Sequence, residues 1–277
     1  MQIRAGYRIS FDSFAATPMH LLLSVHPDRR GDLLSPDVCQ PSVLCRVQTK
    51  EDGFGNLLTR VAAPPGPITF ASDFLIVDSG LVEPAFPHAQ QIPVEDLPDE
   101  TLQFLTASRY CETDELSSLA WRLFSGISPG WARVEAVVDW THHRLAYDYK
   151  RARPTRTAHQ SHLEETGVCR DYAHLAITLC RALNIPARYC TGYLGDIGVP
   201  PLPCAMDFHA WFEVYLEGGW HTFDARHNER RIGRVLMARG RDAADVPIST
   251  TFGTTHLTEF SIVTEEVTPQ AILSAAA

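Results

Sequence analysis

The sequence predicts an α+β protein in which an antiparallel, β-sandwich-like region precedes a set of helices and a second group of strands. Three patterns support this order. Roughly the first eighty residues alternate apolar and polar side chains with the two-residue period of a strand. Residues 114–183 carry apolar side chains at helical spacing, and residues 187–225 return to the strand period. We therefore expect an amino-terminal β domain over residues 1–82, a proline-rich linker over 83–105, and a larger α+β domain over 106–277.

Composition and charge narrow the classes of partner. The chain has 277 residues, of which 45% are hydrophobic, so a large buried core can form. Its formal net charge of −9 disfavours binding to nucleic acid and to anionic membrane surfaces. The longest apolar run near the start, Met19–Val25, is too short to cross a bilayer, and no signal segment is recognisable at Met1. A cytoplasmic location is therefore expected.

The cysteines indicate free thiols in place of a disulfide framework or a zinc site. Seven are present, an odd number in a chain without a recognisable signal segment. No Cys-x-x-Cys pair occurs, and the spacing of Cys39 and Cys45 is not that of a zinc knuckle. His142 and His143 have no thiols near them in the sequence. We therefore expect neither a metal nor a cofactor.

In the amino-terminal region, the alternating pattern predicts four strands: Gly6–Phe14, Ser42–Lys50, Asn56–Ala63 and Ile68–Val77. The segment Glu51–Asn56 supplies Asp-Gly and Gly-Asn steps, which predict a hairpin between the second and third of these strands. Four prolines in the linker argue against regular structure there: Pro84, Pro87, Pro93 and Pro98.

In the second region, helical spacing predicts helices over Asp114–Ile127 and Gly130–Leu145. Strands are expected over Ala187–Leu194, His209–Leu216 and Trp220–Ala225. Helices followed by a run of adjacent strands are typical of an α+β domain.

A third helix is predicted from Gly167 to Leu183, and it ends before Pro186. A stripe of small residues that begins at Cys169 lies beside a bulky apolar stripe. A polar stripe that we expect to face water contains Asp171, His174, Thr178 and Arg181. Free cysteine is usually buried and inert, but Cys169 lies in the first turn, where unpaired N–H groups and the helix dipole favour a thiolate. Its position therefore points to a nucleophile.

A cysteine nucleophile needs a histidine to hold its proton and a third group to orient that histidine. His209 and Trp211 share one face of their strand. A two-residue loop at Glu217-Gly218 or Gly218-Gly219 would put Asp224 on the same face, across from Trp211, whereas a three-residue loop would put it on the opposite face. Exposure or a structural hydrogen bond is expected for His142, His143, His159, His162, His174, His221 and His227.

Motifs in a fixed order carry a family resemblance: FGN among the first strands, then GVCRDYAHL, NIPARYCTGYL, DFHAWFEVYL and WHTFD. With them the chain resembles the transglutaminase-like superfamily, in particular its bacterial members regarded as cysteine peptidases. The resemblance implies a papain- and transglutaminase-like core with a triad of Cys169 as nucleophile, His209 as general base and acid, and Asp224 as orienting carboxylate. Ala225 and Arg226 stand where the superfamily often has proline and then threonine or asparagine.

The triad implies acyl transfer through a thioester. A Cys169–His209 ion pair is expected to hold a thiolate ready near neutral pH. The oxyanion would meet the Cys169 backbone N–H and a second donor, for which Gln160 and Tyr147 are candidates. The residues expected to line the substrate site are Trp211, Tyr193 and Gly167.

The predicted reaction is hydrolysis of an amide in a peptide or protein. The bond that is cleaved is a peptide or isopeptide bond. No calcium-binding loop of the Asp-x-Asp-x-Asn/Asp-Gly type occurs, which argues against the calcium-dependent crosslinking enzymes. Two alternatives stay open. One is an amidase or a transglutaminase-type amine transfer on another substrate, and the other is a non-catalytic binding or assembly module.

Overall fold

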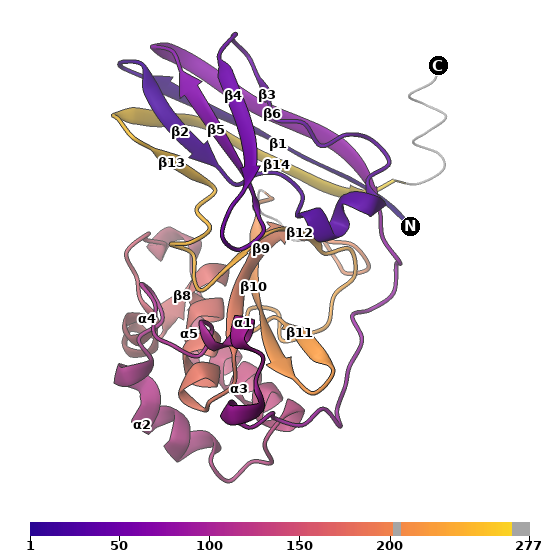
Figure 1. Ribbon diagram of the computed structural model, residues 1–277, viewed down its shortest axis with the longest axis vertical. Coiled ribbons are helices and arrows are strands. Elements are labelled where there is room, and N and C mark those ends of the chain that lie inside the picture. The colour runs from indigo at the N-terminus through magenta and orange to yellow at the C-terminus, as the bar shows by residue number, and fades with distance from the viewer. Residues whose placement is uncertain (202–205, 268–277) are drawn as a thin grey trace.

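The computed structural model describes residues 1–201 and 206–267, and it confirms the predicted α+β class. A β-rich part lies above an α+β part in the view of Figure 1, and the two pack against each other along one sheet of the α+β part. Among the described residues, the connections contain three short 3-10 helices: η1 (Pro27–Asp32), η2 (Val94–Asp96) and η3 (Tyr149–Arg151).

The β-rich part consists of two antiparallel sheets that share one apolar core. The first sheet has the order β14-β1-β6-β3, made of β14 (Thr255–Glu266), β1 (Gln2–Ser13), β6 (Gly66–Val77) and β3 (Gln40–Pro41). The second has the order β13-β2-β5-β4, made of β13 (Ser249–Thr251), β2 (Thr17–Leu21), β5 (Leu57–Ala63) and β4 (Arg46–Glu51). Alternate side chains of β1 and β6 are buried, as the strand period requires.

The predicted hairpin joins β4 to β5. Its loop is closed by the Asp52 carboxylate, which accepts hydrogen bonds from the backbone N–H groups of Phe54 and Asn56 and from the Asn56 side-chain amide. The fully buried Asn56 side chain also bonds the backbone of Arg239 in both directions, at 2.8 and 2.7 Å. The hairpin tip therefore attaches the β-rich part to the sheet of the α+β part.

The strand pairing differs from the predicted division of the chain in one respect. The prediction assigned residues 106–277 to a single domain, but β14 pairs with β1 from Ile3 to Ser13 and β13 pairs with β2. The carboxyl-terminal strands thus complete the amino-terminal sheets. Each covers the edge of a strand that would otherwise expose unpaired backbone groups.

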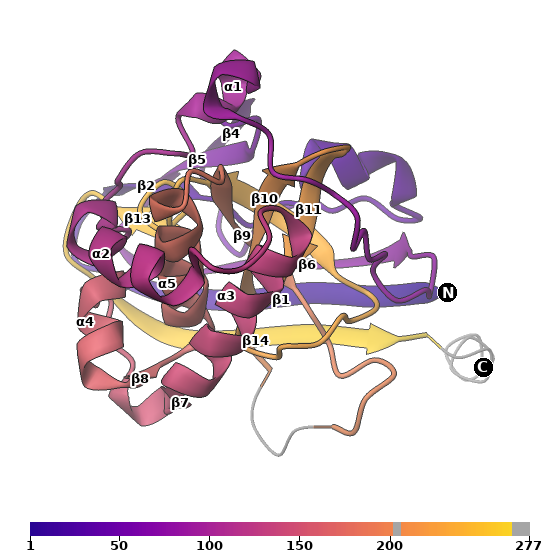
Figure 2. The same ribbon diagram turned by 90° about the horizontal axis from the view of Figure 1, so that it is seen from below.

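The α+β part is built around one antiparallel sheet of order β11-β10-β9-β12. Its strands are β9 (Ala187–Tyr193), β10 (His209–Leu216), β11 (Gly219–Phe223) and β12 (Val235–Gly240). The helices that gather beside this sheet in Figure 2 are α2 (Thr113–Phe124), α3 (Trp131–Arg144), α4 (Ala158–Glu164) and α5 (Cys169–Ala182). The short strands β7 (Ala146–Tyr147) and β8 (Thr166–Gly167) pair in parallel just before α5.

Helix α5 is the central helix of this part and packs directly on β9 and β10. Its small residues Ala173 and Ala176 are buried in the core that α5 shares with one face of β10. The polar stripe expected to face water is also buried: Asp171, His174, Thr178 and Arg181 are at most 2% exposed. This prediction was wrong because the polarity of a side chain does not show whether it has hydrogen-bond partners inside the protein. The Arg181 guanidinium, for example, donates to the carbonyls of Ala187 and Thr106.

The proline-rich stretch 83–105 contains more structure than predicted. It forms η2 and the short helix α1 (Asp99–Leu102), and it buries Leu97, Thr101 and Phe104. The Phe104 ring contacts the rings of Phe54 and Trp220. This stretch is therefore packed against both parts of the molecule.

A buried ion pair fixes the start of α5. The Asp171 carboxylate accepts the backbone N–H of Val168 at 3.0 Å, as an acid in the first helical turn can, and the Arg156 guanidinium at 3.0 Å. Asp171 is fully buried and Arg156 is 1% exposed. Gly167 allows this contact, because a Cβ there would lie 2.6 Å from the Asp171 Cβ.

We expect the Arg156→Ala variant to lose about 3 kcal/mol of unfolding free energy, because the buried Asp171 charge would keep only the more distant Arg170, at 3.4 Å, beside it. Arg153→Ala is the matched control. Like Arg156, Arg153 pairs with Glu164, but its side chain is 39% exposed, so its loss should cost much less stability. Urea denaturation measures both values, and equal losses in the two variants would contradict the structural role of the buried pair.

Candidate active site

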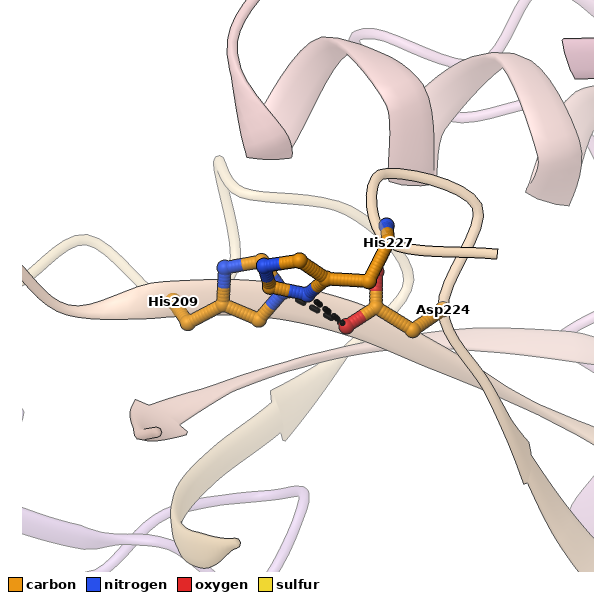
Figure 3. Close-up of side chains that lie close together, drawn as sticks. All are labelled: His209, Asp224 and His227. Carbon is orange, nitrogen blue, oxygen red and sulfur yellow. Dashed lines mark hydrogen bonds and ion pairs between the residues drawn. The ribbon is translucent and has the colours of Figure 1, made fainter. Parts of the chain in front are cut away.

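The hairpin of β10 and β11 brings a histidine and an aspartate together (Figure 3). Leu216 pairs with Gly219, so the loop has two residues, Glu217 and Gly218, and Gly218 has a φ of 89°. This register places Asp224 on the same face as His209, which is the first of the two arrangements that the sequence left open. His209 Nε2 lies 2.7 Å from Asp224 Oδ2.

The thiol of Cys169 opens on the same cavity as His209. This cavity has a volume of about 150 Å³, and its lining includes Cys169 from the start of α5 and His209 from the start of β10. The backbone N–H of Ala210, the residue after His209, donates a hydrogen bond to the Cys169 sulfur. Because Nε2 of His209 is held by Asp224, its Nδ1 is the ring nitrogen left for the cavity.

Burial dominates the electrostatics of the site. It raises the pKa of the Cys169 thiol to about 12, against the smaller opposing effect of the Ala210 N–H. It lowers the pKa of His209, although the Asp224 carboxylate acts in the other direction. The pKa of Asp224 lies well below its ordinary value: burial would raise it, but the His209 and His227 contacts outweigh that effect.

These directions disagree with the expected thiolate and imidazolium at neutral pH. A thiol with a raised pKa stays protonated at pH 7, and an imidazole with a lowered pKa stays neutral. Burial opposes each charge on its own, so these directions favour a neutral thiol and a neutral imidazole, and the expected ion pair stays a prediction.

His227 also belongs to this site, although the sequence predicted only exposure or a structural hydrogen bond for it. Its Nδ1 lies 3.0 Å from Asp224 Oδ2, its backbone N–H bonds Asp224 Oδ1, and its ring lies 4.6 Å from that of His209, centre to centre. It lines the cavity with Cys169. The three-residue step from Asp224 to His227 was the available signal, since aspartate commonly bonds backbone N–H groups two or three residues ahead.

Arg234 holds the other side of Asp224. Its guanidinium is 3.3 Å from Asp224 Oδ2 and 2.5 Å from Glu83 Oε1, and it lies over the ring of Trp211 at 4.6 Å. Arg234 and Asp224 are 8% and 5% exposed. The buried carboxylate thus has a cation beside it as well as two imidazoles.

Within the described part of the chain, His209, Asp224 and His227 could hold a metal ion, because one ligand atom of each lies within 4.8 Å of the others. Two imidazoles and a carboxylate are a donor set that zinc accepts. Here both imidazoles already contact Oδ2 at hydrogen-bonding distance, and the Arg234 guanidinium brings a positive charge to the same oxygen. The arrangement therefore fits a hydrogen-bonded group better than a cation site.

Among the other predicted site residues, Tyr147 does line the cavity at Cys169. Gln160 does not: it caps α4 through the backbone N–H of Thr157. Tyr193 and Gly167 are also corrected. Tyr193 is fully buried in the core of the β-rich part, and Gly167 contacts Asp171.

Trp211 is likewise absent from the lining of the cavity at Cys169 among the described residues. It lies across the sheet from the helices, with Cys190 and Leu236. Side chains along β10 point alternately to opposite faces of the sheet, so Trp211 and Ala210 lie on different faces.

Comparison with known proteins identifies a similar family and a similar solved structure. Residues 117–225 match the family model of the transglutaminase-like superfamily. The crystal structure of a proposed cysteine protease from Cytophaga hutchinsonii superposes with a TM-score of 0.81 and 29% identity, over 97% of this chain and 93% of that chain.

Mycobacterial proteins of uncharacterised function are also similar. One from Mycobacterium leprae is 28% identical over 229 residues, which is 77% of this chain and 79% of the relative. One from Mycobacterium tuberculosis is 35% identical over 94 residues, 31% of this chain and 30% of the relative. Within the described residues, no helix is long and apolar enough to cross a membrane. The matched residues 117–225 include Cys169, His209 and Asp224, so this part of the chain is similar to the transglutaminase-like superfamily.

Proposed function

We propose that the protein is a cysteine-dependent acyl-transfer enzyme that hydrolyses a peptide or isopeptide amide through a thioester. Cys169 is its nucleophile, His209 its general base and acid, and Asp224 the carboxylate that orients His209. One observation carries the proposal: a thiol from the start of a helix and an imidazole already bonded to a buried carboxylate open on the same cavity.

The chemistry follows from the neutral resting state. As the Cys169 sulfur attacks the amide carbonyl, His209 Nδ1 takes the thiol proton, and the charge on Asp224 stabilises the imidazolium that forms. The oxyanion accepts the backbone N–H of Cys169 in the first turn of α5, and Tyr147 stays a candidate for the second donor. His209 returns the proton to the leaving amine, which leaves a thioester on Cys169. Water, deprotonated by the same imidazole, then releases the acid.

The substrate in this proposal is a peptide or protein amide, as the superfamily resemblance implies. The cytoplasmic location expected from the sequence stays a prediction.

We expect iodoacetamide to modify Cys169 in preference to the other cysteines, and His209→Ala to slow this reaction about 100-fold or more at neutral pH, because the thiol loses its proton acceptor. Peptide mapping by mass spectrometry measures the rate at each thiol. Cys45, which is also partly exposed, is the internal reference, and the exposed His143 supplies the control variant His143→Ala. A rate at Cys169 that is the same in His209→Ala and the wild type would refute the role of His209.

The pH dependence of this alkylation separates a neutral pair from an ion pair. Since the pKa of His209 is lowered from 6.5, its neutral, proton-accepting form persists below that pH. The rate at Cys169 should therefore hold through neutrality and fall as the pH drops through this lowered pKa, and it should rise again toward pH 12 as the free thiolate forms. A rate that stays constant down to about pH 4, where carboxylic acids titrate, would instead indicate a pre-formed thiolate.

An activated ester such as p-nitrophenyl acetate should acylate Cys169, because a good leaving group needs little help from the acid step. Mass spectrometry should find an acetyl group on the Cys169 peptide that hydroxylamine removes, and Cys169→Ala should show none. Release to water alone supports hydrolysis, whereas transfer to added glycine methyl ester would show a transferase. Absence of any acyl adduct, with the protein folded, would leave a binding module as the better account.

A further inference from the structure

The outer faces of the two sheets in the β-rich part differ in charge. On each sheet, the side chains that point away from the shared core alternate with those buried in it. The first sheet exposes Arg4 and Arg8 on this outer face, and both are paired with carboxylates: Arg4 with Asp73 and Glu265, and Arg8 with Glu259. The positive charges on that face are therefore neutralised within the protein.

The outer face of the second sheet carries cations that have no such partners. Arg46 and Lys50 on β4 and Arg60 on β5 are exposed on this face, which we call the cationic face. Within residues 1–201 and 206–267, none of the three side chains forms an ion pair or a hydrogen bond. The register of β13, β2, β5 and β4 places no Asp or Glu of these strands on the same face. The cationic face thus has surplus positive charge that is open to solvent.

These cations are close neighbours on adjacent strands. Gln48 pairs with Arg60, so Arg46 and Lys50, which lie two residues to either side of Gln48, are diagonal neighbours of Arg60. Like charges at neighbouring positions of a sheet repel each other and oppose folding. Protection of an edge strand from aggregation would account for charges on β4, but β5 lies between β2 and β4, so it does not account for Arg60. A partner explains the cluster better than folding does.

A shallow groove of about 230 Å³ lies on the cationic face. Its lining includes Arg46, Arg60, His20 and Pro18, and it contains no carboxylate among the described residues. The ring of Phe252, which is 57% exposed, lies edge-on to the ring of His20, with 4.9 Å between their centres. Guanidinium groups bind carboxylates through two parallel hydrogen bonds, and exposed apolar groups suit the other side chains of a peptide. The groove is therefore complementary to an acidic stretch of polypeptide.

We propose that the cationic face binds a short acidic segment of a partner protein, whose carboxylates pair with Arg46, Arg60 and Lys50. The net charge of −9 on the whole chain repels a long polyanion such as nucleic acid, whereas a short segment with a few carboxylates meets mainly the local positive charge. The β-rich part thereby serves as a docking module. This role does not depend on the proposed reaction.

Fluorescence anisotropy on the full chain tests this surface with a dye-labelled peptide of alternating glutamate and threonine. The matched peptide has glutamine in place of glutamate. The acidic peptide should bind at least tenfold more tightly, although protein and peptide are both negatively charged overall, and added salt should weaken its binding. Equal affinity for the two peptides would overturn the proposal, as would a single-stranded oligothymidylate that binds as tightly as the acidic peptide.

Two double variants separate the two sheets. Arg46→Gln with Arg60→Gln should weaken binding of the acidic peptide at least tenfold. Arg4→Gln with Arg8→Gln is the matched control and should leave the affinity unchanged, because those arginines already have carboxylate partners. The same affinity in both double variants would refute the role of the cationic face.

Nuclear magnetic resonance on the wild type keeps the test decisive if a variant fails to fold. The acidic peptide should shift the ring signals of His20 and Phe252, which lie together beside the groove. Shifts at the ring of Phe260 instead would place the peptide on β14 of the first sheet and refute the inference.

Discussion

The buried carboxylate of Asp224 is the group on which the rest of the site depends. It accepts hydrogen bonds from the rings of His209 and His227, from the Arg234 guanidinium and from the backbone N–H of Arg226. A buried negative charge is costly unless it is paired and fully hydrogen-bonded, and these donors meet that requirement. In doing so they fix which nitrogen of His209 is held and which one reaches the cavity.

A second buried carboxylate does the same for the thiol. Asp171 joins the start of α5 to Arg156, so the turn that presents Cys169 is anchored in the interior of the protein. The helix then approaches β10 through alanines, which allow its axis to lie close to the sheet. The nucleophile and its base thus come from different elements, and a charged, desolvated contact holds each in place.

Local patterns predicted the parts of the site that neighbouring residues determine. The hairpin at Asp52 followed from its turn residues. The sequence left two loop lengths open at Gly218, and the observed two-residue loop decides the face on which Asp224 lies. His227 was missed because it reaches Asp224 through a turn, which carries no periodic signal. Arg234 was missed because its second partner, Glu83, lies in a stretch expected to be a linker. The burial that keeps the thiol neutral depends on how the whole α+β part packs. The spacing of residues along one helix does not predict that packing.

The pairing of β14 with β1 also determines when the molecule can fold. Ser13 to Ile3 of the first strand run beside residues 255–266, so the first sheet stays incomplete until residues 255–266 have left the ribosome. Until then the outer edge of β1 is exposed to other nascent chains. A ribosome-bound fragment that ends before β13 leaves that edge uncovered, although its helices and its thiol have already been synthesised.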